Sequence, residues 1–265
     1  MPRLAANVSL LFREAPLLER FGAAAQAGFT AVECLWPYEL PIEQARAEVD
    51  RHGLTVALIN TPMGAGGDAH FGLAACAARR ADFRAGFDQA LRYATGLGAR
   101  GVHVMVGEWE PTPENRAALV GNLREAGAKA GEAGLFLAIE PINGRDRPNW
   151  FLRSTGQALD ILDEVASPAV KLQFDIYHVQ IIEGDLTRRL EGCIDRIGHV
   201  QIAGVPDRHE PDGGEVDIHW VLGALDRLGY AGFVGCEYNP RGATADGLGW
   251  AEPYGIIPRR PGTSA

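Results

Sequence analysis

Four polar side chains stand at or near the ends of strongly apolar segments in the second half of the sequence. They are Glu140 in FLAIEP, Asp175 in KLQFDIYH, Gln201 in HVQIAG and Glu237 in VGCEYNP. Three carboxylates and an amide oxygen that converge in an apolar setting are costly to bury unless a cation joins them. Hard oxygen ligands suit Mg²⁺ or Mn²⁺ better than zinc or copper. The sequence therefore predicts a divalent metal site, although each carboxylate alone is equally typical of a helix N-cap or an ion pair.

Two further side chains are placed to bind a substrate beside these four. His178 follows Asp175 by three positions, and a neutral imidazole can donate a hydrogen bond to a substrate hydroxyl or carboxylate. Arg208 lies in the segment after Gln201, and its planar guanidinium suits a substrate carboxylate. The competing interpretations are a structural histidine and a solvated surface arginine. His103 and His199 fall inside predicted strands, where we expect them to pack or to support the site from behind.

Other cofactor chemistries have little support in the sequence. Lys129 and Lys171 are the only lysines, and they fall on a predicted helix and at the entry end of a predicted strand. A Schiff base, including one to pyridoxal phosphate, needs a lysine at the site, so this route is disfavoured. The glycine-rich segment at 64–69 is a weak match to a dinucleotide loop, and we expect a rim loop there instead. No nicotinamide or pyridoxal phosphate cofactor is therefore expected.

The elements that must position these residues alternate along the whole chain. Eight short apolar segments are separated by amphipathic stretches at about 16–27, 41–52, 73–97, 113–133, 155–166, 185–196 and 217–228. Continuous apolar strands that alternate with helices indicate a parallel sheet covered on both faces. Eight units favour a closed (β/α)8 TIM barrel, whose active site lies at the carboxyl ends of the strands. The predicted strands are Leu4–Leu10, Thr30–Trp36, Leu54–Asn60, Gly101–Val106, Leu135–Glu140, Val170–Asp175, His199–Ala203 and Phe233–Glu237.

Length and composition limit the class of protein. The 265 residues predict a single barrel domain over 1–265, with a Pro/Gly-rich tail from about 243 to 265 that packs over the barrel or frays. A formal net charge of −9 argues against a nucleic-acid partner. No apolar run is long enough to span a membrane, and four scattered cysteines are typical of reduced thiols in a cytoplasmic protein. The composition is compatible with a monomer or a homo-oligomer.

Four motifs resemble hydroxypyruvate isomerase and its relatives among the xylose-isomerase-like barrels. They are IEPINGRD (Ile139–Asp146), QFDIYHVQ (Gln173–Gln180), HVQIAGVPDRHEPDGGEVD (His199–Asp217) and GCEYNPRGATADGLGW (Gly235–Trp250). The opening NVSLLFREAPLLERF is also similar to that family, so the resemblance covers nearly the whole chain. It implies that Glu140, Asp175, Gln201 and Glu237 hold the metal and that the two glutamates are the acid/base pair.

The implied reaction interconverts hydroxypyruvate and tartronate semialdehyde through a cis-enediolate, with His178 and Arg208 on the substrate. Trp36 and Trp109 are expected near the rim, where they would limit substrate length. A four-carbon acid, 2-oxotetronate, would use the same residues and remains the alternative. Ketose 3-epimerases usually carry a histidine where this chain has Gln201, which disfavours that activity. An apurinic endonuclease would require more histidine ligands and a basic face, and a barrel that only binds sugar acids is the non-enzymatic alternative.

Overall fold

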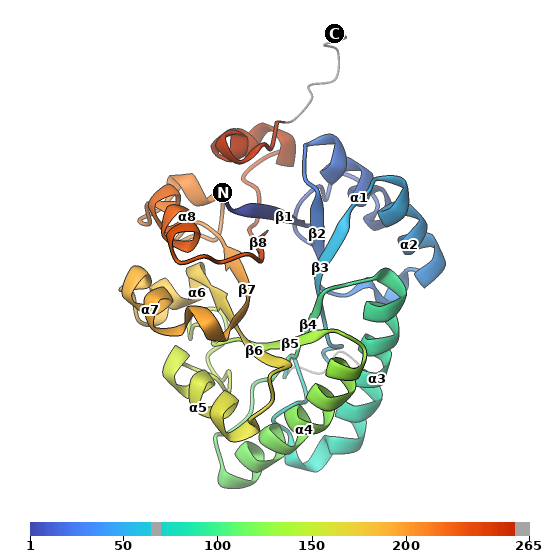
Figure 1. The fold of residues 1–265 in the computed structure, drawn as a ribbon, viewed down its shortest axis with the longest axis vertical. Helices are drawn as coiled ribbons and strands as arrows, with labels where there is room; N and C mark the ends of the chain where they lie inside the picture. The colour runs from blue at the N-terminus through green and yellow to red at the C-terminus, as the bar shows by residue number, and fades with distance from the viewer. Residues whose placement is uncertain (65–69, 258–265) are drawn as a thin grey trace.

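Eight parallel strands form a closed barrel in the computed structural model, which describes residues 1–64 and 70–257 (Figure 1). The strands follow one another around the barrel in chain order, and β8 pairs with β1. This confirms the predicted (β/α)8 fold. The strands are β1 (Arg3–Asn7), β2 (Ala31–Cys34), β3 (Thr55–Asn60), β4 (Gly101–His103), β5 (Phe136–Ile139), β6 (Val170–Asp175), β7 (Ile197–Ile202) and β8 (Phe233–Cys236).

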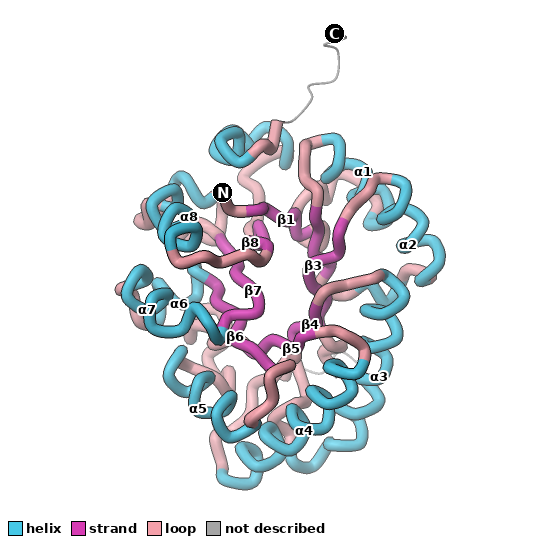
Figure 2. Tube along the Cα trace, viewed as in Figure 1, coloured by secondary structure: helices cyan, strands magenta, loops and turns pink. Residues whose placement is uncertain are grey.

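The helices form a ring around the strands (Figure 2). Most begin and end where the local sequence predicts. Ser154 and Asp217 cap α5 and α8 by accepting hydrogen bonds from the backbone N–H three residues ahead, and Gly98 ends α3 in the left-handed conformation, with φ 67°. The helices are α1 (Leu17–Gln26), α2 (Ile42–Arg51), α3 (Arg80–Leu97), α4 (Pro113–Glu132), α5 (Thr155–Val165), α6 (Ile176–Ile182), α7 (Leu186–Cys193) and α8 (Ile218–Arg227).

Three segments differ from the predicted pattern. The helix predicted at 73–97 begins only at Arg80, after a short 3₁₀ turn at Ala77–Arg79. Helix α6 follows β6 directly and was not predicted. The predicted tail contains eleven residues of 3₁₀ helix, Thr244–Tyr254, whose Leu248 and Ala251 are fully buried. The predicted loop at 64–69 and the tail beyond 257 fall largely outside the described residues.

Register in the second half of the barrel brings the predicted site residues together. The β6–β7 pairing places Asp175 beside Gln201, and the β7–β8 pairing places Gln201 beside Gly235. Because side chains alternate along a strand, the residues two positions apart share the inner face.

Two expectations from composition can be compared with the structure. All four cysteines are free and buried, in agreement with the predicted reduced thiols. No helix within 1–64 or 70–257 combines the length and hydropathy needed to cross a bilayer.

Candidate active site

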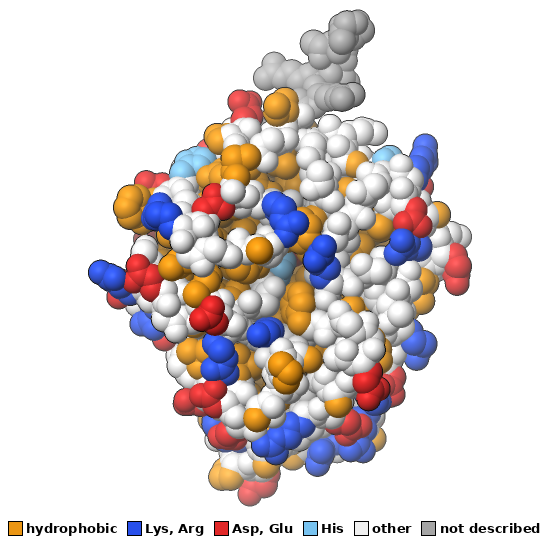
Figure 3. Space-filling model, in the orientation of Figure 1, with side chains coloured by type: hydrophobic (Ala, Val, Ile, Leu, Met, Phe, Trp, Pro, Cys, Tyr) orange, Lys and Arg blue, Asp and Glu red, His pale blue; other side chains and the backbone are white. Residues whose placement is uncertain are grey.

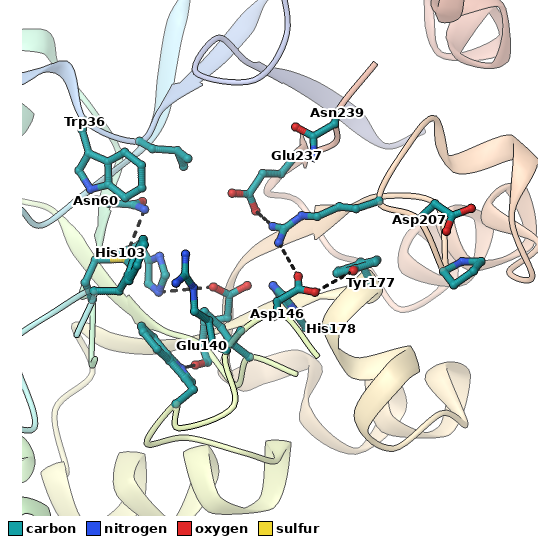
Figure 4. Close-up of a pocket in the computed structure, with 18 residues that line it drawn as sticks. Trp36, Asn60, His103, Glu140, Asp146, Tyr177, His178, Asp207, Glu237 and Asn239 are labelled. Atoms are coloured by element: carbon teal, nitrogen blue, oxygen red, sulfur yellow. Dashed lines mark hydrogen bonds and ion pairs between the residues drawn. The ribbon is translucent and has the colours of Figure 1, made fainter. Parts of the chain in front are cut away.

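A cleft of about 470 Å³ opens at the carboxyl ends of the strands, where active sites of such barrels lie. Its walls include four of the predicted site residues, Glu140, His178, Arg208 and Glu237. The space-filling view, in the orientation of Figure 1, shows the opposite end of the barrel, with apolar, basic and acidic side chains around its centre (Figure 3). Figure 4 shows the side chains that line the cleft. Asp175 and Gln201 do not line the cleft, but Asp175 Oδ2 lies 3.6 Å from His178 Nε2.

Asp175 serves two purposes through its two carboxylate oxygens. Oδ1 accepts a hydrogen bond of 2.8 Å from the Tyr177 N–H and so caps α6. Oδ2 is buried without a hydrogen-bond partner among the described residues, 3.6 Å from His178 Nε2 and 3.9 Å from an Arg208 nitrogen. Burial raises the pKa of Asp175 to about 6, although Arg208 opposes this shift. Asp175 is therefore the N-cap of α6, and its second oxygen remains available beside His178.

Glu140 follows β5 and is buried with one unpaired oxygen. Within the described part of the chain Oε1 has no hydrogen-bond partner, and Oε2 lies 3.6 Å from His103 Nε2. Burial, together with the charges of Asp175 and Glu237, raises the pKa of Glu140 well above its ordinary value. His103 also lines the cleft, so it is not confined to packing inside the barrel.

Glu237 and Arg208 form an ion pair on the other side of the cleft. The Arg208 guanidinium donates at 3.0 Å to Glu237 and at 3.0 Å to Asp146, which the sequence had not singled out. Burial raises the pKa of Glu237 to about 8 despite the opposing charge of Arg208. Arg208 thus neutralises several acids, and the alternative of a solvated surface arginine is wrong.

Gln201 is oriented from behind by residues inside the barrel. Its Nε2 donates to Glu33 Oε2 at 3.0 Å, and its Oε1 accepts from Gln173 Nε2 at 2.6 Å. Glu33, fully buried on β2, also contacts His199. A Cβ on Gly235 would collide with the Glu33 carboxylate, which explains the glycine in the GCEY motif.

Glu33 is a supporting residue that sequence reasoning missed. Its neighbours Val32 and Cys34 gave no sign of a site. A charged residue inside the apolar run AVEC was the available signal, because an acid is rarely buried without a partner.

His178 is held in one tautomer by Asn143. The Asn143 Oδ1 accepts from the backbone N–H groups of Arg145 and Asp146, both at 2.9 Å, so its Nδ2 is the end that faces His178 Nδ1 at 2.7 Å. Nδ1 must then accept, and the proton resides on Nε2. Burial and the charge of Arg208 lower the pKa of His178 well below its ordinary value, which keeps the ring neutral.

The donor set fits a divalent cation. Glu140, Asp175 and His178 place possible ligand atoms within 4.8 Å of one another, and an oxygen of each carboxylate is buried and unpaired among the described residues. The Nε2–H of His178 has no lone pair to offer, so this histidine is suited to donating to a substrate and not to ligating a metal. Glu140 and Asp175, with Glu237 on the same cleft, offer oxygen ligands of the kind that Mg²⁺ and Mn²⁺ prefer, whereas the Gln201 oxygen accepts a hydrogen bond from Gln173.

A second arginine lines the cleft, and the sequence gave no reason to select it. Arg147 stacks its guanidinium on the Phe71 ring, 3.2 Å from the centroid, and lies 4.0 Å from Glu108. Arg147 belongs to the loop between β5 and α5, and only the folded structure shows that this loop brings it to the cleft.

The two tryptophans expected at the rim have different positions. Trp36 lines the cleft as expected. Trp109 does not, because its indole N–H is directed at the Gly72 carbonyl, to which it donates at 2.8 Å. Trp36 alone of this pair therefore contributes to the cleft wall.

Comparisons with known proteins agree with this architecture. A family model described as a xylose isomerase-like TIM barrel matches residues 21–254. A 2-oxo-tetronate isomerase from Cupriavidus necator is 46% identical over 257 residues, covering 96% of this chain and 99% of that protein. A hydroxypyruvate isomerase from Escherichia coli is 39% identical over 257 residues, covering 96% and 100%. The crystal structure of an AP endonuclease, family 2, from Brucella melitensis is 43% identical with a TM-score of 0.94, covering 96% and 99%.

The curated relatives confirm the predicted resemblance to hydroxypyruvate isomerase and the predicted enzyme class, an isomerase. The family model covers most of the chain, and the relatives align with nearly all of it. The chain therefore belongs to the xylose isomerase-like TIM barrel family.

Proposed function

We propose that the protein isomerises a small 3-hydroxy-2-oxo acid to the corresponding 2-hydroxy-3-oxo acid. Hydroxypyruvate, which would give tartronate semialdehyde, is the three-carbon member of this class. The four-carbon member, 2-oxotetronate, is supported equally by the names of the relatives. Both substrates carry a carboxylate and two adjacent oxygens, so the same site residues would serve either.

The observation that carries the proposal is the pair of buried glutamates with raised pKa values in one cleft. Glu140 and Glu237 follow β5 and β8, and Figure 4 shows them facing the centre of the cleft from different sides. A carboxyl group whose pKa is raised by burial keeps its proton to higher pH, so it can act as an acid as well as a base. One glutamate would remove the proton from the carbon that bears the hydroxyl, and the pair would return one to the former carbonyl carbon.

Other residues would bind and orient the substrate. A divalent cation, Mg²⁺ or Mn²⁺, held by Glu140, Asp175, Gln201 and Glu237 would stabilise negative charge developing on two adjacent substrate oxygens. This choice of metal ligands rests on the resemblance together with the oxygen set described above. His178 would donate from Nε2 to a substrate oxygen, and the guanidinium groups of Arg208 and Arg147 would face the substrate carboxylate.

The test is proton NMR in D₂O with Mg²⁺ or Mn²⁺ and each of the two acids. We expect the wild-type protein to convert substrate with incorporation of deuterium at carbon. Glu140→Gln and Glu237→Gln should each fold normally and lose roughly 10²- to 10⁴-fold in turnover, because general acid–base catalysis contributes about that much. Glu114→Gln, at an exposed position on α4, is the matched control and should keep full activity. Near-wild-type turnover in either site variant would remove the role given to that glutamate.

A second candidate is DNA cleavage at abasic sites, because the similar protein from Brucella melitensis is named an AP endonuclease. The formal net charge of −9 opposes binding to a phosphate backbone. Incubation with a duplex containing one abasic site should leave the DNA intact. Cleavage by a preparation that lacks isomerase activity would favour this candidate over the proposed function.

A further inference from the structure

Two buried polar atoms on the β2–β3 side of the cleft have no hydrogen-bond partner among the described residues. They are the indole Nε1 of Trp36, just after β2, and the amide Oδ1 of Asn60, at the end of β3. Both residues line the cleft, and Asn60 is only 4% exposed. Buried polar atoms in native proteins are nearly always paired, so an unpaired donor and an unpaired acceptor in one cleft point to a ligand.

The surroundings fix the position of Asn60 and the direction of its amide. The Asn60 N–H donates to the Leu35 carbonyl at 2.9 Å, which joins the ends of β2 and β3. The Asn60 Nδ2 is directed at Met105 Sδ at 3.4 Å, which leaves Oδ1 as the free end of the amide. The Tyr38 hydroxyl donates to the Asn60 carbonyl and further restrains this corner.

A hydroxyl group is the ligand chemistry that satisfies both atoms. An indole N–H can only donate and an amide oxygen can only accept, whereas a hydroxyl accepts one hydrogen bond and donates another. Figure 4 shows Trp36 and Asn60 together on one side of the cleft, across from Glu237 and Asn239. A substrate whose reacting carbons lie at Glu140 and Glu237 would therefore direct its far end toward this corner.

We propose that Trp36 and Asn60 form a subsite for the terminal hydroxymethyl group of a four-carbon acid, so that the protein prefers 2-oxotetronate to hydroxypyruvate. This inference rests on the proposed function and specifies its substrate. Hydroxypyruvate has no carbon beyond its two reacting carbons and its carboxylate, so it leaves both atoms unpaired. The cleft, of about 470 Å³, has room for the additional hydroxymethyl group of a four-carbon acid.

The test compares kcat/KM for the two acids in the wild-type protein and in Trp36→Phe, which keeps an aromatic ring and removes the N–H. We expect the wild type to favour the four-carbon acid by about tenfold or more, because a site built to bond a hydroxyl discriminates against its absence. Trp36→Phe should lower kcat/KM for the four-carbon acid about tenfold and change that for the three-carbon acid less than about threefold. Trp220→Phe, at a 59% exposed indole on α8, is the control and should change neither value.

A substrate lacking only the terminal hydroxyl, the 4-deoxy acid, completes a cycle that isolates the contact. In the wild type, kcat/KM for this analogue should be about tenfold lower than for the four-carbon acid. In Trp36→Phe the two values should be nearly equal, because the variant no longer contacts the hydroxyl. Equal losses in both proteins, or a wild-type preference for hydroxypyruvate, would overturn the subsite while leaving the isomerase intact. Failure of the wild type to turn over any of the three acids with metal would instead overturn the proposed function, and the subsite with it.

Discussion

Single residues at this site hold more than one role, and geometry separates the roles. Asp175 caps α6 with one oxygen and leaves the other without a partner in the described chain, beside His178. Asn143 supports its own loop with its oxygen and fixes the proton position of His178 with its nitrogen. The sequence showed Asp175 and His178 as candidates, but Asn143 appeared only as part of the IEPIN motif. Its contribution depends on a contact across 35 positions.

Asn143→Asp tests the proton position on His178. A carboxylate keeps the oxygen that accepts from the loop N–H groups, but it cannot donate to Nδ1, so the proton should move to Nδ1 of His178. Two-bond ¹H–¹⁵N correlation spectra of ¹⁵N-histidine protein should show Nε2–H in the wild type and Nδ1–H in the variant, with His178→Gln providing the assignment. We expect turnover to fall about 10- to 100-fold, as for other residues that orient a site through a hydrogen bond. An unchanged tautomer would contradict the role of Asn143.

At the scale of elements, the strand ends bring like charges together. Glu140, Asp175 and Glu237 follow or end β5, β6 and β8, and each has a raised pKa. Strand positions were predictable because continuous apolar segments mark buried parallel strands. Helix α6 was not predictable, because the segment QFDIYHVQII contains no glycine or proline to separate the strand from the helix. Asp175 itself ends the strand and caps the helix, so no separate signal exists.

These raised pKa values predict how stability depends on pH without metal. The Glu237 carboxyl has a pKa of about 8 in the folded protein, against an ordinary value of 4.5, so it holds its proton more tightly in the folded state. Its contribution to stability is complete below about pH 4.5 and is lost as the pH rises through about 8. After chelation, the melting temperature of the wild type should therefore fall more between these pH values than that of Glu237→Gln.

Added Mg²⁺ or Mn²⁺ should raise the melting temperature of the wild type near pH 8, because a ligand of the folded state stabilises it. Thermal unfolding with Glu114→Gln as the control checks both statements. Identical pH profiles for the wild type and Glu237→Gln would contradict the effect assigned to Glu237.

At the scale of the whole molecule, the segment after β8 closes the structure against the start of the chain. The Thr244 hydroxyl oxygen accepts from the Phe12 N–H at 2.7 Å, and the Thr244 N–H donates to Glu14 at 2.6 Å. Leu248 and Trp250 are buried in the same segment. Glycine and proline in this region are typical of a tail, and only contacts across more than 200 positions show that it packs against the barrel.

Leu248→Ala measures what this packing contributes. Removing a fully buried leucine side chain should lower the free energy of unfolding by about 2–5 kcal/mol. Ile257→Ala, at a 64% exposed position near the same segment, should change it by less than about 0.5 kcal/mol. Urea unfolding followed by circular dichroism gives both values. A loss at Leu248 no larger than that at Ile257 would show that the segment does not contribute to the core.

The sequence by itself determined the alternation of strands and helices and the strand-end positions of Glu140, Asp175, Gln201 and Glu237. Such features depend on neighbouring residues, because apolar runs, caps and turns act over a few positions. The tertiary structure alone decided which side chains meet. Glu33 contacts His199 across 166 positions, Arg208 reaches Asp146 across 62, and Trp36 and Asn60 share one corner of the cleft. Hydrogen bonds and charges act through space, so these contacts depend on how the barrel closes.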